Sequence, residues 1–94
     1  MTKREIVTLG GRVQNIGFRD AVLRVAGRHP VAGTVRNLRD GERLEIDVEG
    51  DDVAVDAFLD DVLANPPRSS RIDSVLRTAA EPAGATGFEQ ASTR

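Results

Sequence analysis

The stretch VAGTVRNLRDGERLEIDVE, residues 31–49, contains two strand-like segments joined by a turn. Leu44 to Glu49 alternates strictly between apolar and acidic residues, which is typical of a strand with one buried face. Val31 to Leu38 is predicted to be its partner strand. Between them, Arg39-Asp40-Gly41 carries the Asp-Gly pair that favours a tight hairpin.

A helical pattern lies on each side of this hairpin. On the N-terminal side, apolar residues recur at i, i+3, i+4 and i+7, at Phe18, Ala21, Val22 and Val25. On the C-terminal side the same spacing recurs at Val55, Phe58, Leu59, Val62 and Leu63. Gly27 and Pro30 are expected to end the first helix, and Asn65-Pro66-Pro67 the second.

The outermost segments complete the order of elements. Glu5–Leu9 is predicted to be a strand that ends at Gly10 and Gly11, and Arg71–Thr78 another strand. Gly87–Ala91 is expected to add a short terminal strand. The order strand, helix, strand, strand, helix, strand is the α+β, ferredoxin-like split βαβ (βαββαβ) arrangement. It predicts one domain over residues 1–94, with an antiparallel sheet and both helices on one of its faces.

Composition excludes several classes of chemistry. The 94 residues include no Cys and one His, His29, so thiol nucleophiles, disulfides and multi-histidine metal centres are excluded. A net charge of -2 argues mildly against nucleic acid or an anionic membrane as a partner. No apolar run has the length of a membrane span or a signal peptide, so a cytoplasmic protein is expected.

The loop between the first strand and the first helix has the properties of an anion site. Its glycines allow backbone N–H groups to converge, and the helix N-terminus adds its dipole. Arg19, at the junction of loop and helix, can aim a planar fork of donors at the same anion. A structural turn beside a solvated arginine is the competing interpretation.

Two motifs go beyond this general pattern. GRVQNIGFR, residues 11–19, resembles the acylphosphatase signature G-x-V-Q-G-V-x-F-R. GTVRN, residues 33–37, followed by Asp40-Gly41, resembles the second signature of that family, G-x-V-x-N with a downstream D-G. Softer matches, such as Pro66-Pro67, extend the resemblance over roughly Glu5 to Ala91.

The resemblance implies hydrolysis of small-molecule acyl phosphates to a carboxylate and inorganic phosphate, by a monomer that uses no metal or organic cofactor. Arg19 matches the catalytic arginine, which would hold the phosphoryl group, and Asn37 the catalytic asparagine, which would orient the attacking water. The phosphate-binding loop would comprise Gly11, Arg12, Val13, Gln14, Asn15, Ile16 and Gly17. Inorganic phosphate would then be a competitive inhibitor.

Three positions depart from the family pattern. Asn15 replaces a glycine, and it is the least costly substitute if the position needs a positive φ. Ile16 replaces a valine. Thr34 replaces an aromatic residue and is expected to affect packing more than chemistry. None of these changes touches Arg19 or Asn37.

Other polar residues are given structural roles. His29 is expected to be an ordinary surface histidine, because it lies at the far end of the first helix. The pairs Asp51-Asp52 and Asp60-Asp61 fit helix capping and a solvated face better than a cation site. Ser69-Ser70 has no adjacent base and is expected to be a plain loop.

Two other functions compete with the enzyme. A non-catalytic acylphosphatase-like phosphate-binding or regulatory module would keep the fold without turnover. A nucleic-acid-binding domain would stack bases on sheet aromatics, and the predicted central strands contain none.

Overall fold

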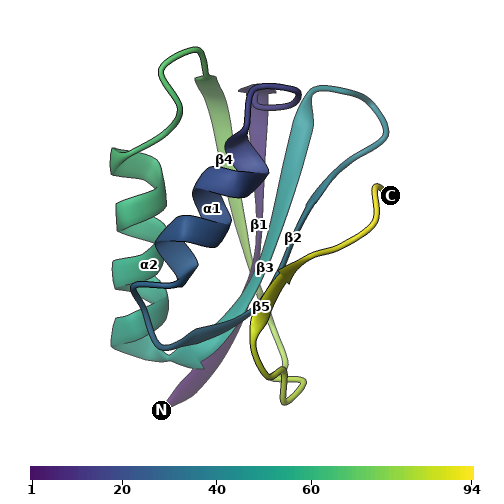
Figure 1. Ribbon diagram of the computed structural model, residues 1–94. Coiled ribbons are helices and arrows are strands. Elements are labelled where there is room, and N and C mark those ends of the chain that lie inside the picture. The colour runs from purple at the N-terminus through teal and green to yellow at the C-terminus, as the bar shows by residue number, and fades with distance from the viewer.

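The computed structural model describes residues 1–94 as five strands and two helices (Figure 1). In chain order these are β1 (Thr2–Arg12), α1 (Phe18–Ala26), β2 (Val31–Asn37), β3 (Arg43–Asp51), α2 (Asp52–Ala64), β4 (Arg71–Ala80) and β5 (Phe88–Gln90). The predicted order of strands and helices is confirmed. Neither helix is long and apolar enough to cross a membrane.

The strands form a single sheet in the order β4-β1-β3-β2-β5. β1 to β4 pair antiparallel with their neighbours, as predicted. β5 pairs parallel with β2 and makes the sheet mixed. The short strand expected within Gly87–Ala91 is present as β5. Its parallel pairing with β2 was not predicted, because it depends on how the chain returns from β4.

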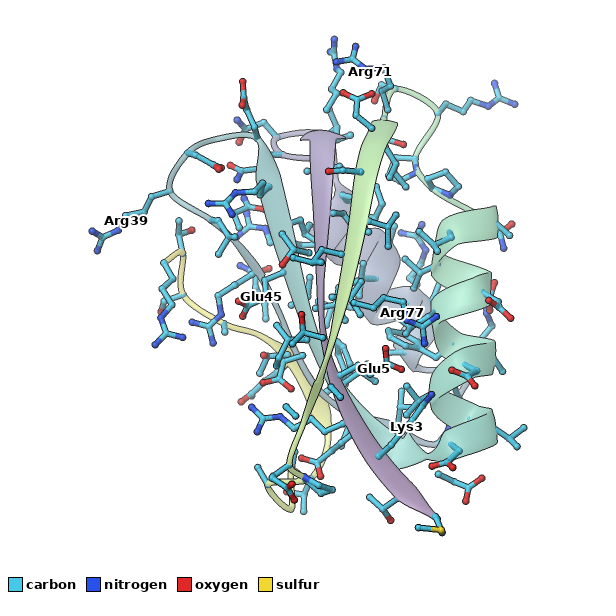
Figure 2. All side chains as sticks on the ribbon, turned by 180° about the vertical axis from the view of Figure 1, so that it is seen from behind. Lys3, Glu5, Arg39, Glu45, Arg71 and Arg77 are labelled. Atoms are coloured by element: carbon cyan, nitrogen blue, oxygen red, sulfur yellow. The ribbon has the colours of Figure 1, made fainter.

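Both helices cover one face of this sheet (Figure 1). Alternate strand residues such as Val7, Leu9 and Ile46 point to that face and are fully buried. They pack against the helix stripes that contain Phe18 and Phe58. The opposite face carries charged side chains and no helix (Figure 2).

β1 extends further than predicted, because Gly10 and Gly11 continue the strand instead of ending it. The pairing of β1 with β4 shifts register between these two residues, as in a β-bulge. Gly11 has φ 131°, and a Cβ there would collide with the carbonyl oxygen of Arg71. The two glycines thus let β4 approach closely while β1 runs on to Arg12.

The connection from β4 to β5 is attached to the sheet by a buried carboxylate. Glu49 accepts hydrogen bonds from the backbone N–H groups of Ala83, Gly84 and Ala85 at 3.3, 3.2 and 3.0 Å. These bonds, that of Ala85 above all, lower the pKa of Glu49 below its usual value. Glu49 therefore directs the chain back to the β2 edge, where β5 pairs.

Candidate active site

A pocket of about 190 Å³ opens where the β1–α1 loop, the N-terminus of α1 and the end of β2 meet. Figure 1 shows that loop at the same end of the sheet as the β2–β3 hairpin. The pocket is lined by Val13, Asn15, Gly17, Phe18, Arg19, Asp20, Asn37 and Gln90. The fold thus brings Arg19, Asn37 and part of the predicted loop together.

The loop reaches this shape through two residues in the left-handed region. Asn15 has φ 62° and Gly17, the N-cap of α1, has φ 80°. Asparagine enters this region more readily than other residues with a Cβ. Asn15 therefore has the positive φ that was considered for this position from the sequence. Asparagine in place of the family's glycine keeps the loop conformation.

The loop leaves its backbone donors free. None of the N–H groups of residues 13–20 donates to a backbone carbonyl, and the first helical bond runs from Ala21 N–H to Gly17 O at 3.0 Å. The N-terminus of a helix carries a partial positive charge. Free N–H groups around a concave surface at that end form an environment that stabilises an anion.

Arg19 adds a full positive charge to the pocket. It is the second residue of α1, is half-buried, and forms no salt bridge or hydrogen bond with another side chain. Most other arginines of the chain are paired with carboxylates, as Arg4 is with Asp47 at 2.8 Å. The five N–H donors of the Arg19 guanidinium are therefore available to a ligand.

Asn37, the last residue of β2, faces the same pocket. Its side chain is almost fully buried, at 6% exposure, and its Oδ1 has no hydrogen-bond partner. A buried acceptor without a donor is rare and costly in folded proteins. The backbone around it is fixed, because its carbonyl accepts from Arg94 N–H at 3.1 Å. Asn37 thus lines the pocket with an amide whose buried Oδ1 has its hydrogen-bonding capacity unused.

The side chain of Gln14 is used within the protein. Its Nε2 donates to the carbonyl oxygens of Leu38 and Arg43 at 2.7 and 2.8 Å. These two bonds tie the loop to the hairpin directly after Asn37. Gln14 therefore fixes the separation between the loop and Asn37, and its side-chain amide does not point into the pocket.

The other loop residues lie around the pocket rather than in its lining. Gly11 and Arg12 are the last residues of β1, where they pair with Ile72 and Arg71. Ile16 is half-buried and packs against the hydrophobic core. Their contribution is to hold the loop backbone in place.

Sequence reasoning did not identify Phe18, Asp20 and Gln90 as pocket residues. Phe18 and Asp20 flank Arg19, so their neighbourhood could have been inferred from the motif. Gln90 gives no such local signal, because its place depends on the parallel register of β5 with β2.

His29 lies outside the pocket and differs from the expected surface histidine. Its side chain is 17% exposed and its Nε2 lies 2.9 Å from Asp61 Oδ2 on α2. This bond, together with Arg28, lowers the pKa of Asp61. Asp61 is therefore a link between the two helices, whereas Asp60 is exposed as expected.

Ser70 lies in the loop before β4, and its hydroxyl donates a hydrogen bond to the carbonyl oxygen of Pro67.

Comparison with known proteins gives a consistent result. A sequence model of the family described as Acylphosphatase matches residues 5–90. The acylphosphatase of Acidiphilium cryptum is 42% identical over 85 residues, which is 90% of this chain and 91% of that protein.

Two solved structures with the same fold differ in how much of their own chain the match covers. The acylphosphatase of Bacillus subtilis superposes with a TM-score of 0.84 at 32% identity, over 97% of this chain and 99% of that one. Full-length HypF, in its phosphate- and nucleotide-bound form, superposes with a TM-score of 0.90 at 30% identity. That match covers 99% of this chain and 12% of HypF, so HypF contains a similar region within a much longer chain.

Proposed function

This chain belongs to the acylphosphatase family and hydrolyses the carboxyl-phosphate bond of small-molecule acyl phosphates, and we propose that Arg19, Asn37 and the loop backbone perform the reaction. The observation that carries this proposal is the meeting of three sets of unsatisfied groups in one pocket. They are the free N–H groups of residues 13–20, the unpaired Arg19 and the buried Oδ1 of Asn37.

The loop and Arg19 bind the phosphoryl group. Its oxygens accept hydrogen bonds from the N–H groups of Val13 to Gly17, at the positive end of α1. The Arg19 guanidinium contacts two of these oxygens and neutralises charge that spreads over them in the transition state. Gly11, Arg12 and the Gln14 side chain contribute indirectly, since they fix the loop between β1 and the hairpin.

Asn37 orients the attacking water. Its Oδ1 accepts one O–H of the water, which supplies the missing donor and aims an oxygen lone pair at phosphorus. The new O–P bond forms as the bond between phosphorus and the acyl oxygen breaks, and the carboxylate leaves with the electron pair.

The reaction needs no strong acid or base. The leaving carboxylate has a pKa of about 4, so it departs without protonation. A neutral amide such as Asn37 cannot remove a proton, so a phosphoryl oxygen receives the second proton of the water. Positioning and charge stabilisation therefore supply the catalysis, in agreement with a pocket whose charged lining residues are Arg19 and Asp20.

The same proposal has the protein acting as a cytoplasmic monomer without a metal or organic cofactor. One chain supplies every residue of the pocket, so a single copy holds a complete site. Sedimentation at catalytic concentration measures the oligomeric state, and cell fractionation the location.

A non-catalytic phosphate-binding module is the second candidate. HypF contains a similar region within a much longer chain, so this fold also occurs as one part of a larger protein. The presence of both Arg19 and Asn37 and the match to 99% of the Bacillus subtilis acylphosphatase favour the enzyme. Turnover separates the two, since a binding module would bind phosphate without releasing it from an acyl phosphate.

The test is benzoyl phosphate hydrolysis by the wild type and Arg19→Ala, with inorganic phosphate as inhibitor. We expect turnover by the wild type, competitive inhibition of that turnover by phosphate, and loss of turnover in the variant. Arg24→Ala, one and a half turns further along the exposed side of α1, is the matched control and should behave as wild type. Near-normal hydrolysis by Arg19→Ala would overturn the assignment of roles.

A further inference from the structure

Gln90 is a pocket residue that the proposed mechanism does not yet use. It lies on β5, where its Cα pairs with that of Val35 in parallel register. Two residues earlier, Phe88 packs on Phe58 of α2 with ring centroids 5.4 Å apart, so this side of β5 faces the helices. Since side chains alternate along a strand, Gln90 points to the same face as Phe88.

Asn37 lies on that face of the neighbouring strand. It is two residues beyond Val35, the register partner of Gln90, and both Val35 and Asn37 are buried on the helix side. Gln90 and Asn37 are therefore diagonal neighbours on adjacent strands, and both line the pocket. Arg19 reaches the same pocket from α1.

The backbone that carries Gln90 is fixed on both sides. Gly33 N–H donates to Gly87 O at 2.9 Å, and Ala91 N–H donates to Val35 O at 2.9 Å. The Gln90 side chain is exposed at the pocket and makes no hydrogen bond within the protein. It thus resembles Arg19 and Asn37 in being well placed and unpaired.

We propose that Gln90 is a third catalytic residue, whose Nε2 donates a hydrogen bond to the attacking water. The proposal rests on the role of Asn37 in holding that water. A water molecule has two protons and two lone pairs. One O–H of the water donates a hydrogen bond to Asn37 Oδ1 and keeps its proton, the other proton passes to a phosphoryl oxygen, and one lone pair attacks phosphorus. The remaining lone pair accepts a hydrogen bond from Gln90 Nε2. This bond fixes the orientation of the water molecule completely.

The acyl group is a less suitable partner for Gln90. Attack on phosphorus is roughly in line with the leaving oxygen, so the acyl group lies on the side opposite the water. Asn37 marks the water side, and Gln90 projects from the strand next to Asn37. The geometry therefore assigns Gln90 to the nucleophile rather than to substrate selection.

Gln90→Met tests this role, because methionine keeps the length of the side chain and removes the amide. We expect kcat to fall about tenfold, the scale of losing one neutral hydrogen bond in the transition state. KM and inhibition by inorganic phosphate should stay within about twofold, since the phosphate contacts are intact. The factor should be the same for acetyl phosphate and benzoyl phosphate.

Glu89→Met is the matched control. Glu89 is the neighbouring residue on β5 and pairs with Thr34 of β2. Because side chains alternate along a strand, Glu89 points to the other face of the sheet. It should keep wild-type kcat. Gln90→Ala provides a second variant, with the same split between kcat and KM, and thermal melting checks that each variant is folded.

Three results would overturn the role of Gln90: an unchanged kcat, a loss confined to KM and phosphate inhibition, or a loss that depends on the acyl group. Asn37→Ala, assayed in parallel, separates this outcome from failure of the proposed function. An inactive Asn37→Ala with a normal Gln90→Met rejects Gln90 alone, whereas an active Asn37→Ala rejects the water site itself.

Discussion

The pocket and the junction between the sheet and α2 use polar side chains in opposite ways. At the junction, Arg77 donates to both carboxylate oxygens of Glu5 at 2.7 Å each. In the pocket, Arg19 has no ion pair and Asn37 Oδ1 has no partner. Paired groups hold the elements of the fold together, and unpaired groups keep their hydrogen-bonding capacity for a ligand.

The junction is a network of paired charges. Lys3 contacts Glu5 and Asp56 at 3.0 and 2.7 Å, and Arg77 also reaches Asp56 at 3.0 Å. Figure 2 shows Lys3, Glu5 and Arg77 beside α2, at the edge of the sheet formed by β1 and β4. Every charged side chain of this network has a partner of opposite charge, so changes there should affect stability and not turnover.

The largest expected effect is that of Asn37→Ala on catalysis. We expect kcat to fall by at least about a hundredfold, as for other single transition-state contacts. The free energy of unfolding should stay within about 1 kcal/mol of wild type or rise, because the change removes an unsatisfied buried acceptor. Steady-state kinetics and urea unfolding measure the two quantities. A clear loss of stability with normal kcat would show that Asn37 serves the fold rather than catalysis.

Glu5→Gln should show the opposite pattern. Glu5 is 8% exposed, and the charge that Arg77 and Lys3 share would be lost. We expect the free energy of unfolding to fall by about 2 kcal/mol, as for buried hydrogen bonds to charged groups. The kcat for benzoyl phosphate should stay within about twofold of wild type. A tenfold fall in kcat would show that the junction acts on the pocket.

Acid should destabilise the fold through its paired carboxylates Glu5 and Glu49. Arg77 above all lowers the pKa of Glu5, and the backbone N–H of Ala85 lowers that of Glu49. A lowered pKa means that the unfolded chain binds more protons than the folded one, so stability falls as pH drops below about 4.5, the unfolded value. Urea unfolding between pH 6 and pH 3 measures this slope.

Glu5→Gln provides the control for the acid effect, because it removes one of the responsible groups. Its stability should depend less steeply on pH than that of wild type over the same range. Identical slopes for the two proteins would exclude Glu5 as a source of the acid sensitivity.

The smallest expected effect is that of Asn15→Gly in the loop. Glycine adopts φ near 62° without strain, so the loop conformation should persist. We expect kcat/KM to change by less than about threefold, because the backbone N–H groups are the ones that bind. Asn15→Val is the contrast, since a β-branched residue strongly resists positive φ and should distort the loop. Equal activities of the two variants would show that loop conformation does not limit catalysis.

The local parts of this molecule were predictable from sequence. Asp40 and Gly41 lie in the predicted hairpin, where Asp40 Oδ1 accepts from the N–H groups of Glu42 and Arg43. The helix stripes that contain Phe18 and Phe58 are buried as their spacing indicated. Arg19 could be placed at the start of α1 because its position depends on a few neighbouring residues.

The parts that depend on distant pairing were not predictable. The continuation of β1 through Gly10 and Gly11 is stabilised by β4, more than sixty residues away. The positions of Glu49 and Gln90 depend on the return of the chain to β2 after β4. His29 could not be paired with Asp61 from sequence, because the packing of α1 on α2 decides that contact.

A titration of inorganic phosphate, followed by the amide signals in NMR spectra of the uniformly labelled protein, shows whether the loop and Arg19 together bind the phosphate. We expect the N–H signals of Val13 to Asp20 and the Arg19 side chain to shift together, with a single affinity. The signals of Lys3, Glu5 and Arg77 should stay in place. Saturable shifts confined to the opposite face of the sheet, or none at the loop, would contradict phosphate binding by the loop and Arg19.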